Sequence, residues 1–147
     1  MQRVVCDVGV VISGLLSGKG APAALLDLWQ DGAFDLVVSA LWIAELDRVA
    51  ARPKISRYVA ADDAAELRDA VLRQALVFDD PPAAPGPTPD PGDDYIAALA
   101  RASHANLIVS GDRHLLGLSD PHPPAATPRP FLDDLSPRPW NPRGAGE

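Results

Sequence analysis

Two carboxylates in this sequence closely follow short apolar runs. Asp7 comes directly after the run at residues 3–6, and Asp112 comes shortly after the run at residues 107–109. If both runs are strands of a parallel sheet, both side chains lie at the carboxyl ends of the strands, where the ligand crevices of such sheets form. Carboxylates brought together repel each other, so a cluster of them persists only if it takes up protons or holds a cation.

Two further acids come from segments with helical character. Glu45 lies in the first half of one expected helix, and Asp94 lies in the first turn of another, with Asp93 as the near alternative to Asp94. Carboxylates from four separate elements can converge on one point. Oxygen ligands in this number suit a hard divalent ion, Mg²⁺ or Mn²⁺, whereas zinc prefers Cys or His.

Each acid also has an ordinary structural interpretation. Asp7 and Asp112 can serve as turn or cap residues, and Asp93 or Asp94 can cap a helix. Glu45 can lie on a solvated helix face. The prediction of a metal site therefore rests on the joint placement of the acids at strand ends and helix starts.

The elements that must position these acids alternate between strands and helices. We expect strands at residues 3–6, 34–38, 76–78 and 107–109, and helices at about 21–32, 40–51, 63–75, 93–103, 113–116 and 127–135. The apolar run 10–16 stays unassigned, and the proline-rich stretch 81–91 is expected to be a surface loop. This alternation predicts a three-layer α/β/α sandwich around a central, mostly parallel sheet.

Capping chemistry places the starts of two of these helices. Ser39 is expected to cap the helix at 40–51, which ends before Pro53. Asp63 and Glu66 resemble a capping box, so the helix at 63–75 is expected to open at Asp63.

The composition fits one soluble domain of 147 residues, with 47% hydrophobic and 22% charged residues. Lys and Arg number 13 against 20 Asp and Glu, a net charge of −7, which argues against a protein that mainly coats nucleic acid. We expect a domain over residues 1–135 and a flexible tail, rich in Pro, Arg and Gly, over 136–147.

Other classes of site and location find little support in the sequence. Cys6 is expected to pack as a small hydrophobe, and no Gly-x-Ser-x-Gly elbow or Cys–His pairing indicates a nucleophile. The start at Met1 runs directly into a strand pattern, and no stretch of 18 or more apolar residues occurs. We therefore expect a cytoplasmic protein without a membrane segment.

Six sequence runs, in order, carry a family resemblance. They are Val-Val-Cys-Asp-Val-Gly-Val, Leu-Val-Val-Ser-Ala-Leu-Trp-Ile-Ala-Glu-Leu, Ala-Arg-Pro-Lys, Asp-Pro-Gly-Asp-Asp-Tyr-Ile-Ala-Ala-Leu-Ala, Leu-Ile-Val-Ser-Gly-Asp-Arg-His-Leu-Leu and Thr-Pro-Arg-Pro-Phe-Leu. Over about residues 1–135 the chain resembles PIN-domain nucleases, in particular the VapC-like toxins of bacterial type II toxin–antitoxin pairs.

The resemblance implies an endoribonuclease that depends on Mg²⁺ or Mn²⁺, forms a homodimer and is held inactive by a cognate antitoxin. The four acids of the family match Asp7, Glu45, Asp94 and Asp112, with Asp93 as the alternative to Asp94. They would hold one or two ions, and Glu45 would be a ligand or the base for the attacking water.

Local cations are candidates for contacts with RNA phosphates, because the chain as a whole is acidic. These cations are Arg48, Arg52, Lys54 and Arg113. An ordinary salt-bridged surface is an equally good interpretation of each one.

Three positions depart from the family pattern. Val8 and Gly9 stand where the family has Thr or Ser and then Asn, and His114 replaces a further Asp. Loss of groups that orient a metal ligand costs roughly 10- to 100-fold in affinity or activity. The alternative function is therefore a catalytically weakened PIN-fold binding module that acts through complex formation.

A phosphoacceptor domain is a third class of function, but the second acid that the dehalogenase type needs after Asp7 is missing.

Overall fold

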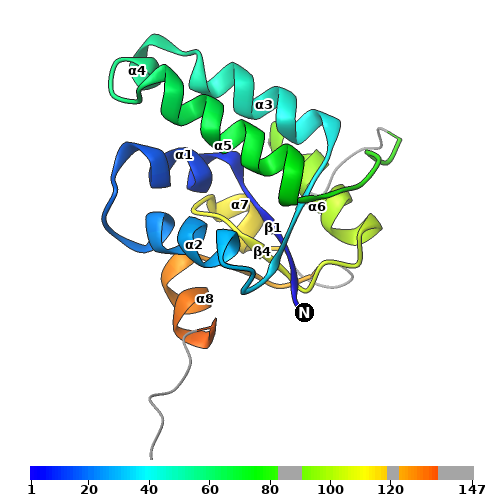
Figure 1. The fold of residues 1–147 in the computed structure, drawn as a ribbon. Coiled ribbons are helices and arrows are strands. Elements are labelled where there is room, and N and C mark those ends of the chain that lie inside the picture. Colours follow the sequence, from blue (N-terminus) through cyan, green and yellow to red (C-terminus); the bar gives the residue numbers. More distant parts are fainter. Residues whose placement is uncertain (83–90, 119–122, 136–147) are drawn as a thin grey trace, which may run out of the picture.

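The computed structural model describes residues 1–82, 91–118 and 123–135, and of residues 91–94 it describes the backbone only. The tail expected at 136–147 and most of the loop expected at 81–91 lie outside the described residues. Within the described part, five strands and eight helices alternate along the chain (Figure 1).

The strands form one parallel sheet in the order β3-β2-β1-β4-β5. Their bounds are β1 Arg3–Cys6, β2 Asp35–Val38, β3 Leu76–Val77, β4 Leu107–Val109 and β5 Ala125–Ala126. Val4 of β1 pairs with Leu36 on one side and with Leu107 on the other. The chain builds outward from β1 to β3 and then returns to add β4 on the opposite side of β1. This reversal makes the carboxyl ends of β1 and β4 the topological switch point, where ligands bind in open parallel sheets.

Helices pack around the sheet and complete the α/β sandwich predicted from the sequence. Their bounds are α1 Val8–Leu16, α2 Ala21–Gln30, α3 Ala40–Ala50, α4 Pro53–Ser56, α5 Ala61–Gln74, α6 Pro91–Ala102, α7 Arg113–Leu116 and α8 Pro128–Leu135. α1 packs against α2 and α3, α2 packs against α8, and α6 packs on β1 and β4. α3 and α5 lie side by side (Figure 1).

Short strands of apolar residues form the centre of the core. Val4, Val5 and Cys6 of β1 are completely buried, as expected for a strand covered on both faces of a parallel sheet. Phe34 packs edge-to-face on Phe131 of α8 with ring centroids 5.2 Å apart, which ties the last helix to the core.

The apolar run that the sequence left unassigned forms α1. Four of its residues are buried, namely Val8, Val10, Val11 and Ile12, so no continuous polar face marks the run as a helix. No single helix in the described ranges is long and apolar enough to span a membrane, and α1 and α2 meet that criterion only as a pair bent by 102°, by length and composition alone.

Two of the expected helix starts are wrong, whereas those at residues 21, 40 and 113 are confirmed. α5 begins at Ala61, and its N-cap residue makes no side-chain hydrogen bond. Asp63 therefore lies inside the first turn and does not form a capping box with Glu66. At this position its negative charge still interacts favourably with the helix dipole. α6 begins at Pro91, earlier than predicted, because proline is tolerated in the first turn. Ser39 caps α3 by accepting a hydrogen bond from the backbone N–H of Trp42, as predicted.

Candidate active site

Asp7 lies at the point where β1 ends and α1 begins, and both oxygens of its carboxylate are held. Oδ1 accepts a hydrogen bond from the backbone N–H of Gly9 at 3.2 Å, and Oδ2 accepts one from the Ser110 hydroxyl at 2.9 Å. The backbone N–H of Asp7 donates to the carbonyl of Val109 at 2.8 Å, which extends the pairing of β1 with β4. The carboxylate is therefore fixed at the switch point of the sheet.

Ser110 connects Asp7 to Asp112. Its side chain is completely buried, and its Oγ donates to Asp7 while it accepts from the backbone N–H of Asp112 at 2.9 Å. Asp112 in turn caps α7, since its Oδ1 accepts from the backbone N–H of His114 at 2.7 Å. The structure thus brings together two of the predicted acids through one hydroxyl group.

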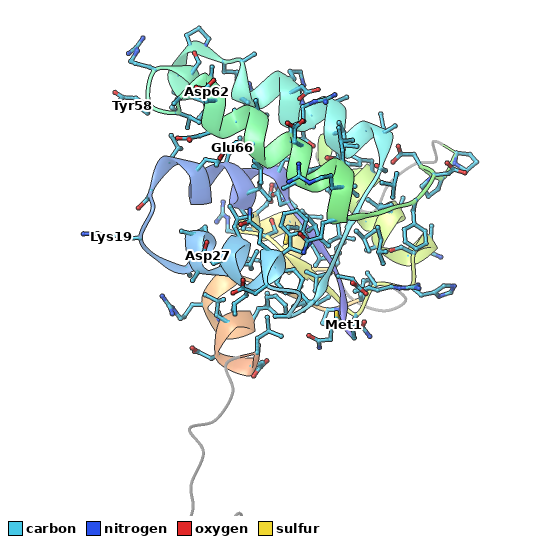
Figure 2. The ribbon with its side chains drawn as sticks, in the orientation of Figure 1. Met1, Lys19, Asp27, Tyr58, Asp62 and Glu66 are labelled. Carbon is cyan, nitrogen blue, oxygen red and sulfur yellow. The ribbon has the colours of Figure 1, made fainter. Side chains whose placement is uncertain are left out.

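A depression in the surface exposes this pair of acids. It has a volume of about 380 Å³ and is lined by Asp7, Gly9, Val10, Ser13, Pro22, Gly111, Asp112 and Pro128. Glu45 does not line it. A larger cavity of about 720 Å³ lies between α1, α2 and α5, with Asp27 and Glu66 in its wall (Figure 2). None of the predicted site residues lines that cavity.

Glu45 is positioned by the packing of α3 against the end of β1. The indole N–H of Trp42 donates to the carbonyl of Cys6 at 2.7 Å, and the Trp42 side chain is completely buried. Glu45 follows Trp42 by three residues, so it lies near the same helix face. Its Oε2 accepts a hydrogen bond from the Tyr95 hydroxyl, and Arg48 lies 4.0 Å from its Oε1.

Tyr95 links the Glu45 helix to the start of α6. Burial raises the pKa of the Tyr95 phenol, and its hydrogen bond to Glu45 and the negative charges of Glu45, Asp7 and Asp80 raise the pKa further. The phenol is therefore a hydrogen-bond donor at any physiological pH. Three carboxylates thus act electrostatically on this one side chain.

The third predicted acid is only partly located. Asp93 and Asp94 belong to the first turn of α6, directly before Tyr95, but their side chains lie outside the described residues. Among the side chains that are described, no three His, Cys, Asp or Glu residues are placed to hold a metal ion together. The structure thus joins Asp7 to Asp112 and brings Glu45 into contact with α6.

The donor chemistry fits a hard dication. Asp7, Asp112 and Glu45 offer carboxylate oxygens, which Mg²⁺ and Mn²⁺ prefer. Burial and the charge of Asp7 raise the pKa of the Cys6 thiol to about 12, so the thiol stays protonated and offers neither a thiolate ligand nor a nucleophile. His114 is exposed and contacts Asp112 through its backbone.

The cations proposed to contact RNA are all exposed. Arg48 is 64% exposed beside Glu45, and Arg113 is the first residue of α7, next to Asp112. Arg52 and Lys54 lie at α4, beyond the end of α3. Arg48 and Arg113 are thus the two that adjoin the acids in the chain.

Sequence reasoning missed three residues around these acids: Ser110, Tyr95 and Asp80. The contact between Ser110 and Asp7 joins residues 103 positions apart, so no local pattern predicts it. Asp80 carries a signal that could have been used, because it is an acid within three residues of the end of a strand, β3.

Comparisons with known proteins identify the family of the chain. The family model described as the PIN domain matches residues 3–114, which is well over half of the chain. A search of curated proteins gave no match. Among solved structures, the chain is similar to one in the crystal structure of VapBC2 from Rickettsia felis bound to a DNA fragment from their promoter. The TM-score is 0.58 at 13% sequence identity, over 86% of this chain and 98% of that one. At this identity the likeness concerns the fold, and it agrees with the family match: the chain belongs to the PIN domain family.

Proposed function

We propose that this protein is a Mg²⁺- or Mn²⁺-dependent endoribonuclease and the toxin of a bacterial toxin–antitoxin pair. The observation that supports this best is the linkage of Asp7 to Asp112 through Ser110 at the switch point of the sheet. A PIN domain with two oriented carboxylates at this place has the oxygen donors that a phosphodiester-cleaving metal site requires.

Four carboxylates would hold the metal: Asp7, Glu45, Asp112 and one acid of α6, either Asp94 or Asp93. When bound, the metal supplies a water of lowered pKa and stabilises negative charge on the phosphate under attack. No nucleophilic side chain is then required.

The residues of the chain itself orient the reactants. Tyr95 holds one oxygen of Glu45, which leaves the other to serve as a ligand or as the base for the attacking water. Arg48 and Arg113 adjoin the acids and are the leading candidates for contacts with RNA phosphates. Arg52 and Lys54 would bind the RNA backbone farther from the acids, at α4.

An active enzyme is better supported than a weakened binding module. Val8 stands where the family has Thr or Ser, and it is completely buried and offers no polar group to the site. However, the backbone N–H of Gly9 and the Ser110 hydroxyl each orient one oxygen of Asp7, so this carboxylate is held without polar side chains at positions 8 and 9.

RNA cleavage by the purified protein tests this proposal. We expect cleavage of total RNA with Mn²⁺ and none with a chelator. Consecutive residues on a helix point about 100° apart, so only one of Asp93 and Asp94 can face the metal. The Asn variant of that residue should lose about 100-fold or more of the activity, as expected for a metal ligand. The Asn variant of the other residue should stay within about threefold of the wild type. Equal cleavage by the wild type and both variants would indicate a contaminating nuclease and remove the support for the assignment.

The proposed partner is a cognate antitoxin. The similar structure is that of VapBC2 from Rickettsia felis bound to a DNA fragment from their promoter, which supports a protein partner for this chain. Co-expression with the product of an adjacent gene should yield a stable complex that suppresses RNA cleavage. We also propose that the free protein is a homodimer, so light scattering should give twice the 15.5 kDa mass of the chain. Cleavage that continues undiminished in the co-purified complex would contradict the role of an antitoxin.

A further inference from the structure

Asp80 follows strand β3 at the same edge of the sheet as the proposed metal-binding acids Asp7 and Asp112. The backbone N–H of Phe78 donates to the carbonyl of Val38 at 2.9 Å, so the pairing of β3 with β2 continues just past Val77. Asp80 follows two residues later. Because all strands are parallel, Asp80 lies past the carboxyl end of β3, at the same edge of the sheet where Asp7 follows β1.

The two oxygens of Asp80 have different environments. Oδ2 accepts a hydrogen bond at 3.0 Å from the backbone N–H of Leu41, in the first turn of α3 and one turn before Glu45. Oδ1 is buried and has no hydrogen-bond partner among the described residues. A buried carboxylate oxygen without a partner is unfavourable. The capping of α3 therefore explains one oxygen of Asp80 and leaves the other unexplained.

The charge of Asp80 acts on the same side chain as the charges of the site. Tyr95, which donates to Glu45, is affected electrostatically by Asp80 as well as by Asp7 and Glu45. In the described part of the chain, the ion pairs are those of Arg48 with Glu45 and Arg68 with Asp47, so no cation pairs with Asp80 there. Its negative charge is added to the acidic site without a neutralising partner.

We infer that Asp80 is a positioning residue of the proposed dication site, with two effects. It anchors the start of α3 and so holds Glu45 in place, and its carboxylate, of which one oxygen is buried without a hydrogen-bond partner among the described residues, adds negative charge that favours a bound Mg²⁺ or Mn²⁺. This inference rests on the proposed function, because it needs a metal at the acids. It assigns to Asp80 a role in metal affinity rather than in contact with RNA.

Calorimetric titration with Mn²⁺ tests the inference without reference to activity. Asp80→Asn keeps an oxygen that can accept from Leu41 but removes the charge, and Asp80→Ser removes the charge with a shorter polar side chain. Asp79→Asn removes the same charge from the exposed neighbouring residue and is the matched control. We expect both Asp80 variants to bind Mn²⁺ about tenfold more weakly, as for groups that support a metal ligand. Asp79→Asn should stay within about twofold, and the melting temperatures of the metal-free variants should be close to that of the wild type. Having both Asn and Ser at position 80 keeps the test valid if one of them fails to fold.

The outcomes separate this inference from the proposed function. If the wild type binds Mn²⁺ and the Asp80 variants bind it equally well, Asp80 only caps α3 and the inference is wrong. If Asp79→Asn weakens binding as much as the Asp80 variants do, a diffuse acidic field is responsible and the inference is also wrong. If the wild type does not bind Mn²⁺ at all, the proposed metal-dependent function fails first.

Discussion

Asp7→Asn is expected to abolish Mn²⁺ binding and to lower metal-dependent RNA cleavage by more than about 100-fold, beyond the loss typical of groups that only support a ligand. Asparagine keeps an oxygen that can accept from the Gly9 N–H or the Ser110 hydroxyl, so the start of α1 should survive. What it loses is the negative charge at the switch point of the sheet. The metal-free variant should be close to the wild type in stability, because relief of like-charge repulsion offsets the loss of one of the two hydrogen bonds to the carboxylate.

Thermal melts with and without Mn²⁺, together with a calorimetric titration, measure both effects. Asp62→Asn removes the same charge from an exposed position on α5 and serves as the control (Figure 2). It should bind Mn²⁺ and cleave RNA like the wild type. Asp7 is not a metal ligand if Asp7→Asn and Asp62→Asn respond alike to the metal.

Ser110→Ala should reduce both stability and metal affinity. The substitution leaves Asp7 Oδ2 and the backbone N–H of Asp112 without the hydroxyl that joins them, at a fully buried position. Loss of a buried hydrogen-bond partner costs about 1–3 kcal/mol of unfolding free energy. Because the Asp7 carboxylate loses one of its two hydrogen bonds and the backbone N–H of Asp112 loses its bond to the hydroxyl, Mn²⁺ should bind roughly 10- to 100-fold more weakly. Denaturant unfolding of the metal-free protein and Mn²⁺ titration measure these two quantities separately.

Ser103→Ala is the matched control for this substitution. Ser103 is equally buried, but its hydroxyl makes only a long contact of 3.4 Å with the carbonyl of Ala100 and does not touch the acids. We expect a smaller loss of stability and unchanged metal affinity. A Ser110→Ala protein that is destabilised but binds Mn²⁺ as tightly as Ser103→Ala would reduce Ser110 to a structural residue.

The strand ends that carry Asp7 and Asp112 can be predicted from the sequence. Short runs of Val, Ile and Leu that stop at polar residues indicate buried strands, and the alternation with helices indicates a parallel sheet, which fixes the edge where both acids lie. The fold class and these two positions therefore follow from local patterns.

Other features depend on contacts that no local pattern encodes. The spacing of apolar residues does not reveal the helix α1, because Val8 and Val10–Ile12 are all buried and leave no alternation of apolar and polar faces. Ser110 acquires its role only when β4 pairs with β1, and Trp42 reaches the carbonyl of Cys6 across 36 residues. Which side chain bridges two acids is set by tertiary packing.

Helix boundaries show the same limit on a smaller scale. Asp63 with Glu66 has the spacing of a capping box, yet α5 begins earlier, at Ala61, so the local signal gives way to the packing of the whole helix. Proline at position 91 looks like the end of a loop and instead begins α6. For this reason the turn that carries Asp93 and Asp94 could be located only approximately.

A crystal soaked in Mn²⁺ and measured for anomalous scattering tests the central claim most directly. The account predicts one strong anomalous peak within coordination distance of the carboxylates of Asp7 and Asp112, with an acid of α6 in the same coordination shell. Absence of a peak there at millimolar Mn²⁺, in crystals that show manganese bound elsewhere on the protein, would contradict it.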